Sequence, residues 1–304
     1  MLAAARIPFI PMQCADVTPR HTDRRIYQEK IDGKRGLAFD DANGDIRMFA
    51  RSGNDITDEC SHIVRALEKM GMMHFILDGE IATADGDFNS LQNAKNTGEK
   101  TWFNVFDVLR WTGVDMMRRP LQSRLNVLFD EVPDVKYVTK LPYELDTYDE
   151  ALAWFKQVYE VEGKEGLIGK PANSPYVPKN ETVWTKMKGK LDPFDAKLIG
   201  LMSSEKRLFS AAVIADANDN YLCNVGTGFD GAELKHIYDM VLANKGVNNT
   251  IIPMPVLKKT FIQCKPLWCM IGGQSFTKNN NGTVSVRSPT WQGFRANPTS
   301  RRKS

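Results

Sequence analysis

The sequence changes character near Lys190, and this change limits the possible folds more than any other feature. Up to that point, segments with helical periodicity alternate with apolar strands, whereas the remainder contains short predicted strands separated by frequent Gly, Asn and Pro. The length of 304 residues also fits about two domains at ~150 residues each. We therefore predict two domains, 1–190 and 191–304, with a hinge at 191–195.

The first domain is predicted to mix strands and helices. Thr147 and Glu150 form a capping box ahead of an amphipathic segment, which indicates the start of a helix. Asn43 and Gly44 are typical of a hairpin turn. The predicted elements are a strand hairpin over 24–53, a helix over 57–71, short buried strands over 74–83 and 101–109, and a helix over 148–162.

The second domain is predicted to be a small β-barrel. Its strands are short, and one helix over about 231–244 interrupts them. This pattern is typical of an OB-fold, although other small α+β modules share it. The fold class of the whole chain is therefore α+β.

Charge is divided unevenly along the chain. Residues 1–190 contain 26 Lys and Arg against 29 Asp and Glu, whereas residues 191–304 contain 14 against 8. From Met240 to the end there are ten basic residues and no acidic one. This asymmetry indicates a polyanionic partner for the C-terminal part, or alternatively a solvated surface with a basic tail.

Composition excludes several classes of protein. With 42% hydrophobic and 25% charged residues the chain is globular, and no apolar run approaches the ~20 residues that span a bilayer. The five cysteines form no CxxC pair, and the four histidines form no zinc motif. We expect reduced thiols and a cytoplasmic location, with no membrane association.

Two glycine-containing segments resemble phosphate-binding loops but lack essential features. Residues 226–231 match GxGxxG literally, yet no acidic residue follows after Asp239 to bind a ribose, so we reject a dinucleotide site. A P-loop is excluded because Pro171 follows Gly169 and Lys170.

Six short segments contain side chains suited to phosphoryl chemistry. A lysine amine attacks phosphorus only when deprotonated, and cations such as Lys34 and Arg35 beside Lys30 favour the neutral form. Lys186 and Lys188 share one face of a strand because side chains alternate. Taken singly, each segment also fits a surface turn, a helix end or an edge strand. The segments are 30–35 (KIDGKR), 51–53 (RSG), 78–80 (DGE), 106–109 (FDVL), 165–170 (EGLIGK) and 184–188 (WTKMK).

In this order and spacing, the six segments resemble motifs I, Ia, III, IIIa, IV and V of the covalent nucleotidyltransferases. These enzymes comprise ATP-dependent DNA ligases, RNA ligases and mRNA capping enzymes. EGLIGK favours a polynucleotide ligase, and SPY at 174–176 and VGTGF at 225–229 are similar to DNA ligase segments. The resemblance covers roughly residues 24–295. Because the first motif begins near residue 28, we expect no large N-terminal DNA-binding domain, as in a minimal, phage-type DNA ligase.

The resemblance implies both a fold and an activity. The expected fold is an adenylyltransferase domain with antiparallel sheets and flanking helices, followed by an OB-fold domain with a basic tail. The expected activity is ATP-dependent sealing of nicks in double-stranded DNA through a lysyl-AMP and an adenylylated 5′-phosphate, in repair, replication and recombination. The expected cofactors are ATP and Mg²⁺, with Mn²⁺ as an alternative. We expect a monomer in the cytoplasm, or in the host cytoplasm if a phage encodes it.

The resemblance also implies roles for catalytic side chains. Lys30 would attack the α-phosphate of ATP, while Lys186 and Lys188 would clamp that phosphate. Glu80 and Glu165 would hold Mg²⁺, with Glu80 also accepting from the ribose hydroxyl.

Further residues would bind the base and the substrate phosphates. Phe106 would stack on adenine, although it also fits a core aromatic. Arg35 and Arg51 would hold the 5′-phosphate of the nick as well as line the nucleotide site. The remaining predicted contacts are Gln28 and Glu29 in the nucleotide site, and Arg287 and Arg295 on DNA.

Two positions depart from the family pattern. Gln28 stands where many DNA ligases carry Glu, and its amide oxygen could still accept from the adenine amino group. The last motif reads R-x-P at Arg287 instead of R-x-D-K, so the residues that assist pyrophosphate release are left open.

Two alternatives to a DNA ligase remain. An RNA ligase or capping-type guanylyltransferase would share Lys30, Glu80 and Lys186, and labelling by ATP or GTP would separate them. A nucleic-acid-binding module with a degenerate site would not need the carboxylates of Glu80 and Glu165.

Overall fold

The computed structural model describes residues 7–15, 23–41, 43–84, 91, 94, 98–180, 183–252, 261–278 and 282–295. The chain divides into two compact units, Met1–Lys188 and Gly189–Ser304. The fold is of the mixed α+β type, with mainly antiparallel sheets. Across the described residues, no helix has the length and apolar character needed to cross a membrane.

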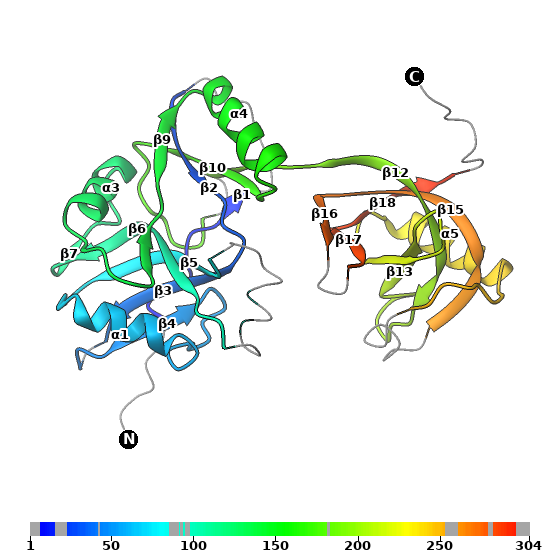
Figure 1. Cartoon of the computed structure of the whole chain (residues 1–304), viewed down its shortest axis with the longest axis horizontal. Coiled ribbons are helices and arrows are strands. Elements are labelled where there is room, and N and C mark those ends of the chain that lie inside the picture. Colours follow the sequence, from blue (N-terminus) through cyan, green and yellow to red (C-terminus); the bar gives the residue numbers. More distant parts are fainter. Residues whose placement is uncertain are drawn as a thin grey trace. The chain divides into compact units, whose positions relative to one another are not determined.

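The first unit contains two sheets with helices beside them (Figure 1). One sheet has the order β1-β11-β10-β2-β9, and the other has the order β4-β3-β5-β6-β7, with β8 also on β6. The strands are β1 (Cys14–Ala15), β2 (Arg25–Glu29), β3 (Lys34–Asp40), β4 (Ile46–Ala50), β5 (Ile76–Ala82), β6 (Trp102–Trp111), β7 (Val114–Asp115), β8 (Val138–Lys140), β9 (Tyr143–Asp146), β10 (Gly166–Pro171) and β11 (Trp184–Lys188). The helices are α1 (Ser61–Lys69), α3 (Leu121–Asp130), α4 (Tyr148–Lys156) and the π-helix η1 (Gln157–Val161).

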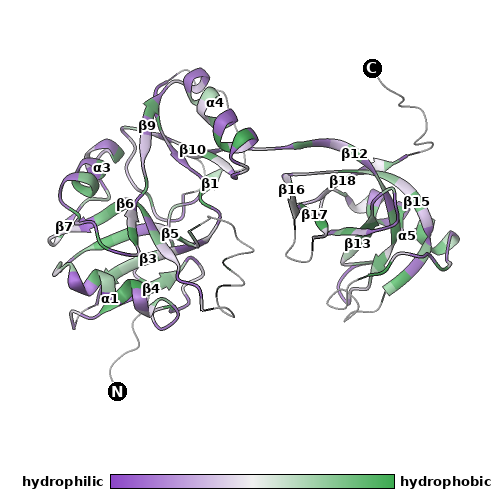
Figure 2. Ribbon diagram, in the orientation of Figure 1, coloured by the Kyte–Doolittle hydropathy of each residue, from purple (hydrophilic) through white to green (hydrophobic). Residues whose placement is uncertain are grey.

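The alternating side chains of β3 pack into two different cores. Ala38 packs with α1 and α3 residues in one buried cluster, whereas Leu37 and Phe39 belong to a second cluster with Met12 and Trp184. Figure 2 shows hydrophobic residues on the strands and both polar and hydrophobic residues on α1. Burying each large apolar side chain contributes about 1.5–3 kcal/mol, so both faces of this sheet stabilise the unit.

The predicted hairpin over 24–53 is only half correct. β3 and β4 pair around a turn at Gly44, which has φ +84°, but β2 lies in the other sheet. The chain leaves the first sheet at Lys30, and Gly33 then passes so close to β5 that a Cβ would lie 2.2 Å from the Ile81 carbonyl oxygen. A residue with a side chain could not make this approach, so the two strands are separated by a glycine-dependent crossing.

The predicted capping box is confirmed at the start of α4. The Thr147 side chain accepts from the Glu150 backbone N–H at 3.4 Å, and Glu150 Oε2 accepts from the Thr147 backbone N–H at 2.8 Å. The helix then changes to the π-helix η1 instead of continuing regularly to residue 162.

Removing the Thr147 hydroxyl should destabilise the protein modestly. We expect Thr147→Ala to lower the free energy of unfolding by about 1 kcal/mol, because an orphan N–H at the helix start loses its acceptor. Urea denaturation measures the change. Thr139→Ala, at an exposed threonine in β8, is the matched control and should shift stability by less than about 0.5 kcal/mol. Equal effects of the two variants would contradict the role of the cap.

In its described residues, the second unit is a curved set of antiparallel strands with one helix. Its main sheet has the order β14-β13-β12-β15-β18, and β16 pairs with β17. The strands are β12 (Leu191–Met202), β13 (Ala211–Ala215), β14 (Tyr221–Val225), β15 (Phe261–Gly273), β16 (Ser275–Lys278), β17 (Val284–Arg287) and β18 (Thr290–Phe294). Helix α5 (Gly231–Ala243) confirms the single predicted helix, and its Ile237 and Val241 are fully buried.

The segment 191–195 forms the beginning of β12, and its role as a hinge remains a prediction. Leu191 pairs with Gly273, and Phe194 pairs with Ile271, with a register irregularity between them. Pro193 lies at this irregularity, where a missing N–H costs no regular ladder hydrogen bond.

The glycine-rich segment before α5 is a structural turn. Trp291 N–H donates to the Thr227 carbonyl at 3.0 Å, and a Cβ on Gly228 would lie 2.6 Å from Trp291 N. β14 pairs antiparallel with β13, unlike the strand of a dinucleotide fold. The rejection of a dinucleotide site is therefore consistent with this local geometry.

Candidate active site

A cavity of about 680 Å³ in the first unit gathers residues from both sheets. Its lining comes mainly from β2, β3, β5, β6, β10 and β11 and from the turns that follow β2 and β4. Most of the predicted nucleotide-site residues line it: Gln28, Glu29, Lys30, Arg35, Arg51, Glu80, Phe106, Lys186 and Lys188. Sequence segments up to 160 residues apart therefore meet as predicted, although each residue's role remains a prediction.

Lys30 is held at the end of β2 by its backbone and by its side chain. Its backbone N–H donates to the Gly166 carbonyl at 2.8 Å, and Nζ forms an ion pair with Glu165. The other carboxylate oxygen of Glu165 lies 3.5 Å from Lys188 Nζ. The Glu165 side chain is only 3% exposed, so this carboxylate lies between two cations with little water to screen it.

Gly166 allows this close approach. It has φ +137°, and a Cβ there would lie 2.0 Å from the Met187 carbonyl oxygen of β11. β10 therefore packs tightly between β2 and β11, which places Glu165 beside Lys30 and Lys188.

The alternation predicted for β11 is confirmed. Lys186 and Lys188 line the cavity together with Trp184, whereas the intervening Met187 is buried in the cluster around Tyr27. The strand thus presents two ammonium groups to one side of the cavity.

Glu80 lies on β5 at the wall of the cavity. It pairs across the sheet with Arg35 on one side and Asn104 on the other. Burial raises the pKa of Glu80 to about 7, although Arg35 and Lys30 oppose the shift. The carboxyl group therefore exchanges its proton near neutral pH.

Lys170 is a site residue that the sequence reasoning did not single out. Its Nζ donates to Gln28 Oε1 at 2.5 Å and lies 4.3 Å from the ring centroids of both Phe106 and Trp184. Burial lowers the pKa of Lys170 to about 8. Its position in EGLIGK, two residues after Ile168 on the same strand face, was the available signal.

Phe106 is more enclosed than a free stacking platform would be. The ring is 7% exposed, and the Arg35 guanidinium carbon lies 4.5 Å from its centroid. With Lys170 also over the ring, Phe106 makes cation–π contacts in this conformation. Stacking on adenine remains a prediction.

The two predicted phosphate-binding arginines have different surroundings. Arg35 donates through Nε and Nη2 to the carboxylate of Asp78, at 2.5 and 2.6 Å. Arg51 lies exposed in the turn after β4 at the rim of the cavity. Arg51 thus has the more open position for a bulky anion.

The ATP dependent DNA ligase domain family matches residues 10–188, which is more than half of the chain. The chain belongs to this family of ATP-dependent DNA ligase domains. The matched region includes every motif that lines the cavity.

Two relatives show how much of a ligase the chain corresponds to. It is 27% identical over 235 residues to the multifunctional non-homologous end joining protein LigD of Pseudomonas aeruginosa, covering 69% of the chain and 26% of that protein. It is 26% identical over 271 residues to the DNA ligase of Pyrobaculum islandicum, covering 77% of the chain and 46% of that protein. The chain therefore spans less than half the length of these curated relatives.

Solved ligase structures show the same fold. A mycobacterial DNA ligase D complexed with ATP and MES aligns with a TM-score of 0.55 at 22% identity, over 97% of this chain and 98% of that one. A Lig E DNA ligase aligns with a TM-score of 0.64 at 16% identity, over 94% and 99%.

Two of the four predicted DNA contacts of this ligase-family chain, Arg287 and Arg295, lie in its second unit. Arg287 ends β17, and Arg295 follows β18. Arg295 Nε forms an ion pair with Asp195 Oδ1 at 3.0 Å, which joins the end of β18 to β12. The basic residues of 296–304, predicted to form a tail, lie outside the described residues. Contact of Arg287 and Arg295 with DNA remains a prediction.

The ligase cavity has a donor set that fits one hard divalent cation. Glu80 lines the cavity and Glu165 forms an ion pair with Lys30 behind that lining, and Mg²⁺ commonly takes one or two carboxylates and completes its shell with water and substrate phosphate. No cluster of three or more His, Cys, Asp or Glu that could hold a metal occurs in the described part of the chain.

Proposed function

We propose that this chain is an ATP-dependent DNA ligase that seals nicks in double-stranded DNA. The observation that carries the proposal is the ion-pair cluster of Lys30, Glu165 and Lys188, whose two lysines line the cavity together with Glu80 and Lys186. Attack of a lysine amine on a nucleotide phosphate uses both carboxylates and cations near the nucleophile, whereas simple nucleic-acid binding does not need the carboxylates. The family match disfavours an RNA ligase or a capping-type enzyme.

In the first proposed step, the Lys30 amine attacks the α-phosphorus of ATP. An N–P bond forms, the bond from the α-phosphorus to the bridging oxygen breaks, and pyrophosphate leaves. Lys186 and Lys188 neutralise charge on the α-phosphate oxygens, which is the main requirement of phosphoryl transfer. Mg²⁺, held by Glu80 and Glu165, would supply further positive charge and favour the neutral amine.

In the second and third steps, AMP is transferred and then released. The 5′-phosphate of the nick attacks the lysyl-AMP phosphorus and frees Lys30, and the 3′-hydroxyl then attacks the adenylylated 5′-phosphate and expels AMP. Arg35 and Arg51 hold the 5′-phosphate, because a guanidinium suits an anion with several oxygens. Gln28 and Glu29 line the nucleotide site, and Phe106 supports the base.

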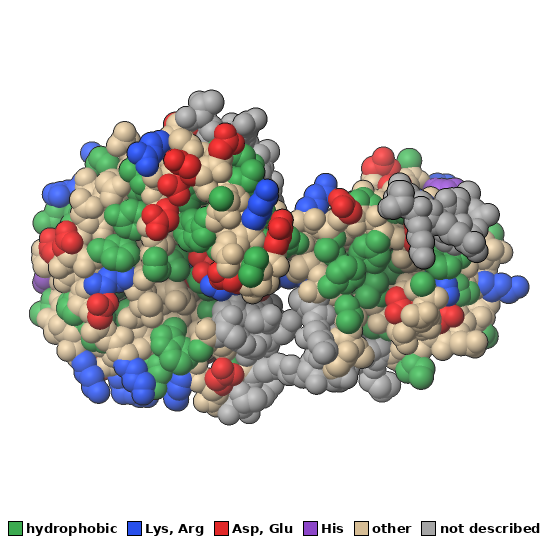
Figure 3. Space-filling model, turned by 45° about the horizontal axis from the view of Figure 1, so that its top comes forward, with side chains coloured by type: hydrophobic (Ala, Val, Ile, Leu, Met, Phe, Trp, Pro, Cys, Tyr) green, Lys and Arg blue, Asp and Glu red, His purple; other side chains and the backbone are tan. Residues whose placement is uncertain are grey.

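We further propose that the second unit is an OB-fold domain that contacts the duplex. Five antiparallel strands and one helix support this assignment. The uneven charge of the chain supports phosphate contacts, including those of Arg287 and Arg295. Figure 3 shows acidic and basic side chains interspersed over the visible face of the first unit, in line with its near-balanced charge. We also propose a cytoplasmic monomer that acts in repair, replication or recombination.

One two-stage assay tests the proposed function. The full chain is incubated with α-labelled ATP and Mg²⁺, separated from free nucleotide, and then mixed with nicked duplex DNA. We expect covalent labelling first, then transfer of AMP to DNA and sealing. Labelling by GTP, or sealing of nicked RNA in preference to DNA, would overturn the assignment in favour of a capping enzyme or an RNA ligase.

The raised pKa of Glu80, about 7, gives a pH prediction. Below that pH the carboxyl group is protonated and cannot ligate Mg²⁺, so self-adenylylation at limiting Mg²⁺ should fall as pH drops through 7. Raising Mg²⁺ should move the midpoint to lower pH, because the cation competes with the proton. The Glu80→Gln variant should self-adenylylate slowly at every pH, and its rate should not show the Mg²⁺-dependent fall below pH 7. Identical pH profiles for the two proteins would exclude Glu80 as the titrating group.

A further inference from the structure

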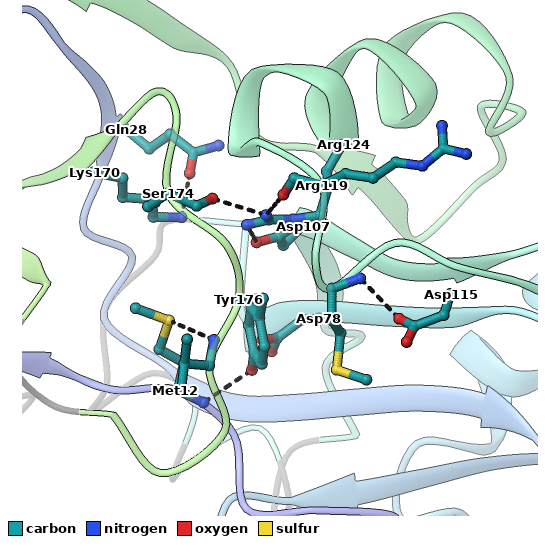
Figure 4. A network of polar contacts seen from close by, with 12 residues as sticks. Met12, Gln28, Asp78, Asp107, Asp115, Arg119, Arg124, Lys170, Ser174 and Tyr176 are labelled. Atoms are coloured by element: carbon teal, nitrogen blue, oxygen red, sulfur yellow. Dashed lines mark hydrogen bonds and ion pairs between the residues drawn. The ribbon is translucent and has the colours of Figure 1, made fainter.

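The buried hydroxyl of Tyr176 lies between the Asp78 carboxylate and the Met12 backbone (Figure 4). It donates to Asp78 Oδ2 at 2.7 Å and accepts from the Met12 backbone N–H at 3.0 Å. Arg35 Nη2 donates to the same Asp78 oxygen at 2.6 Å and to the Met12 carbonyl at 3.3 Å. Tyr176 therefore contacts both groups that bind Arg35, the Asp78 carboxylate and the Met12 backbone.

These contacts leave one guanidinium nitrogen for a ligand. Nε and Nη2 of Arg35 are occupied by Asp78 and Met12, whereas Nη1 makes no hydrogen bond within the part of the chain that is described. Arg35 also lines the cavity. Because the guanidinium is planar, the contacts of Nε and Nη2 with Asp78 and Met12 also fix the direction in which Nη1 points.

Tyr176 is itself rigidly placed. Its ring packs edge-on against Phe9 and Trp184, with centroid distances of 6.1 and 5.8 Å. Burial and the carboxylate of Asp78 raise the pKa of Tyr176, so its hydroxyl stays protonated and keeps donating.

A second buried pair anchors the turn that carries Tyr176. Arg124 and Asp107, both fully buried, form a bidentate ion pair at 2.7 and 2.8 Å. Arg124 Nη1 also donates to the Ser174 carbonyl at 3.1 Å, and Tyr176 N–H donates to the Met117 carbonyl at 2.8 Å. The chain between β10 and β11 is therefore tied to α3 and to the segment that follows β7 (Figure 4).

We propose that Tyr176 is a positioning residue that acts through Asp78 and Met12 to orient Arg35 toward the 5′-phosphate of the nick. The inference rests on the proposed function and names a residue outside the six motifs. The Tyr176 hydroxyl restrains the Asp78 carboxylate and the Met12 backbone together, whereas a phenylalanine at this position could bond to neither. Loss of the restraint lets the guanidinium rotate on Asp78, and misorientation of a phosphate-binding group slows the step that uses it.

A double-mutant cycle with step-resolved kinetics tests the proposal. Wild type, Tyr176→Phe, Arg35→Lys and the double variant are adenylylated, purified and mixed with nicked duplex in single turnover. Tyr176→Phe should slow AMP transfer to DNA by about tenfold, the size of one charge-assisted hydrogen bond, and leave self-adenylylation within about twofold. The double variant should be no slower than Arg35→Lys, because residues that act through one another are not additive.

A matched tyrosine separates positioning from stability. Tyr143→Phe removes a hydroxyl that accepts from Gln122 Nε2 at 2.9 Å, and it should leave both steps unchanged. Thermal unfolding of all variants is measured in parallel. Additive effects of Tyr176→Phe and Arg35→Lys, an effect confined to self-adenylylation, or no effect on either step would overturn the positioning role. Failure of the wild-type protein to label with ATP would instead refute the proposed function.

Discussion

Replacing Lys30 by alanine or by arginine should abolish covalent labelling of the protein by α-labelled ATP. Alanine removes the amine, whereas arginine keeps a positive charge beside Glu165 but is not a nucleophile, since guanidinium stays protonated. A phosphoramidate bond cannot form in either variant. We expect labelling to fall to background, and the bond in wild type to be acid-labile and base-stable. A denaturing gel followed by peptide mapping measures both.

The control for Lys30 is another lysine paired with a glutamate in the same region. Lys164 Nζ lies 2.8 Å from Glu29 Oε2, and Lys164 does not line the cavity. Lys164→Ala should therefore keep its label. Since Lys30→Arg preserves the ion pair, loss of labelling in that variant with an unchanged unfolding temperature locates the defect in chemistry. Persistent labelling of Lys30→Ala would place the nucleophile elsewhere.

Glu165→Gln should slow self-adenylylation by about 100-fold, the cost of one preorganised charged group at a reacting centre. Glutamine keeps the shape of the side chain but removes the charge that holds Lys30 and attracts Lys188. Because Glu165 is also a proposed Mg²⁺ ligand, higher Mg²⁺ should restore part of the rate. The rate of labelling over a range of Mg²⁺ concentrations measures the effect.

A nearby glutamate provides the control for Glu165. Glu162 lies on the surface, and its carboxylate is 3.0 Å from Lys164 Nζ. Glu162→Gln should retain wild-type labelling at every Mg²⁺ concentration. If Glu165→Gln behaved in the same way, the carboxylate would have no part in the reaction, and the metal site would have to be built on Glu80 alone.

Features that depend on local periodicity could be predicted from the sequence. The common face of Lys186 and Lys188 follows from strand alternation, and the cap at Thr147 follows from two residues three apart. Helix α5 was predicted within one residue of its end. In each case, residues close together in the sequence determine the local structure.

Features that depend on distant partners could not be predicted. Arg35 is predicted from the sequence as a phosphate-binding residue, but its ion pair with the buried Asp78 of β5 could not be predicted. Lys170 meets Gln28 across 142 residues, and the break between β2 and β3 depends on contact of Gly33 with Ile81. A local sequence pattern cannot predict such contacts, because they form between residues that come together only when the sheets assemble.

The pairing of β10 with its two neighbours has a consequence for how such a chain tolerates changes in length. Leu167 lies opposite Glu29 of β2 and Met187 of β11, so one register fixes both partners. An insertion of a single residue within Gly166–Pro171 would turn every later side chain of that strand to the other face, taking Lys170 away from Gln28. Selection should therefore remove insertions and deletions in this segment more strictly than substitutions. The length of the EGLIGK segment should stay constant among related sequences.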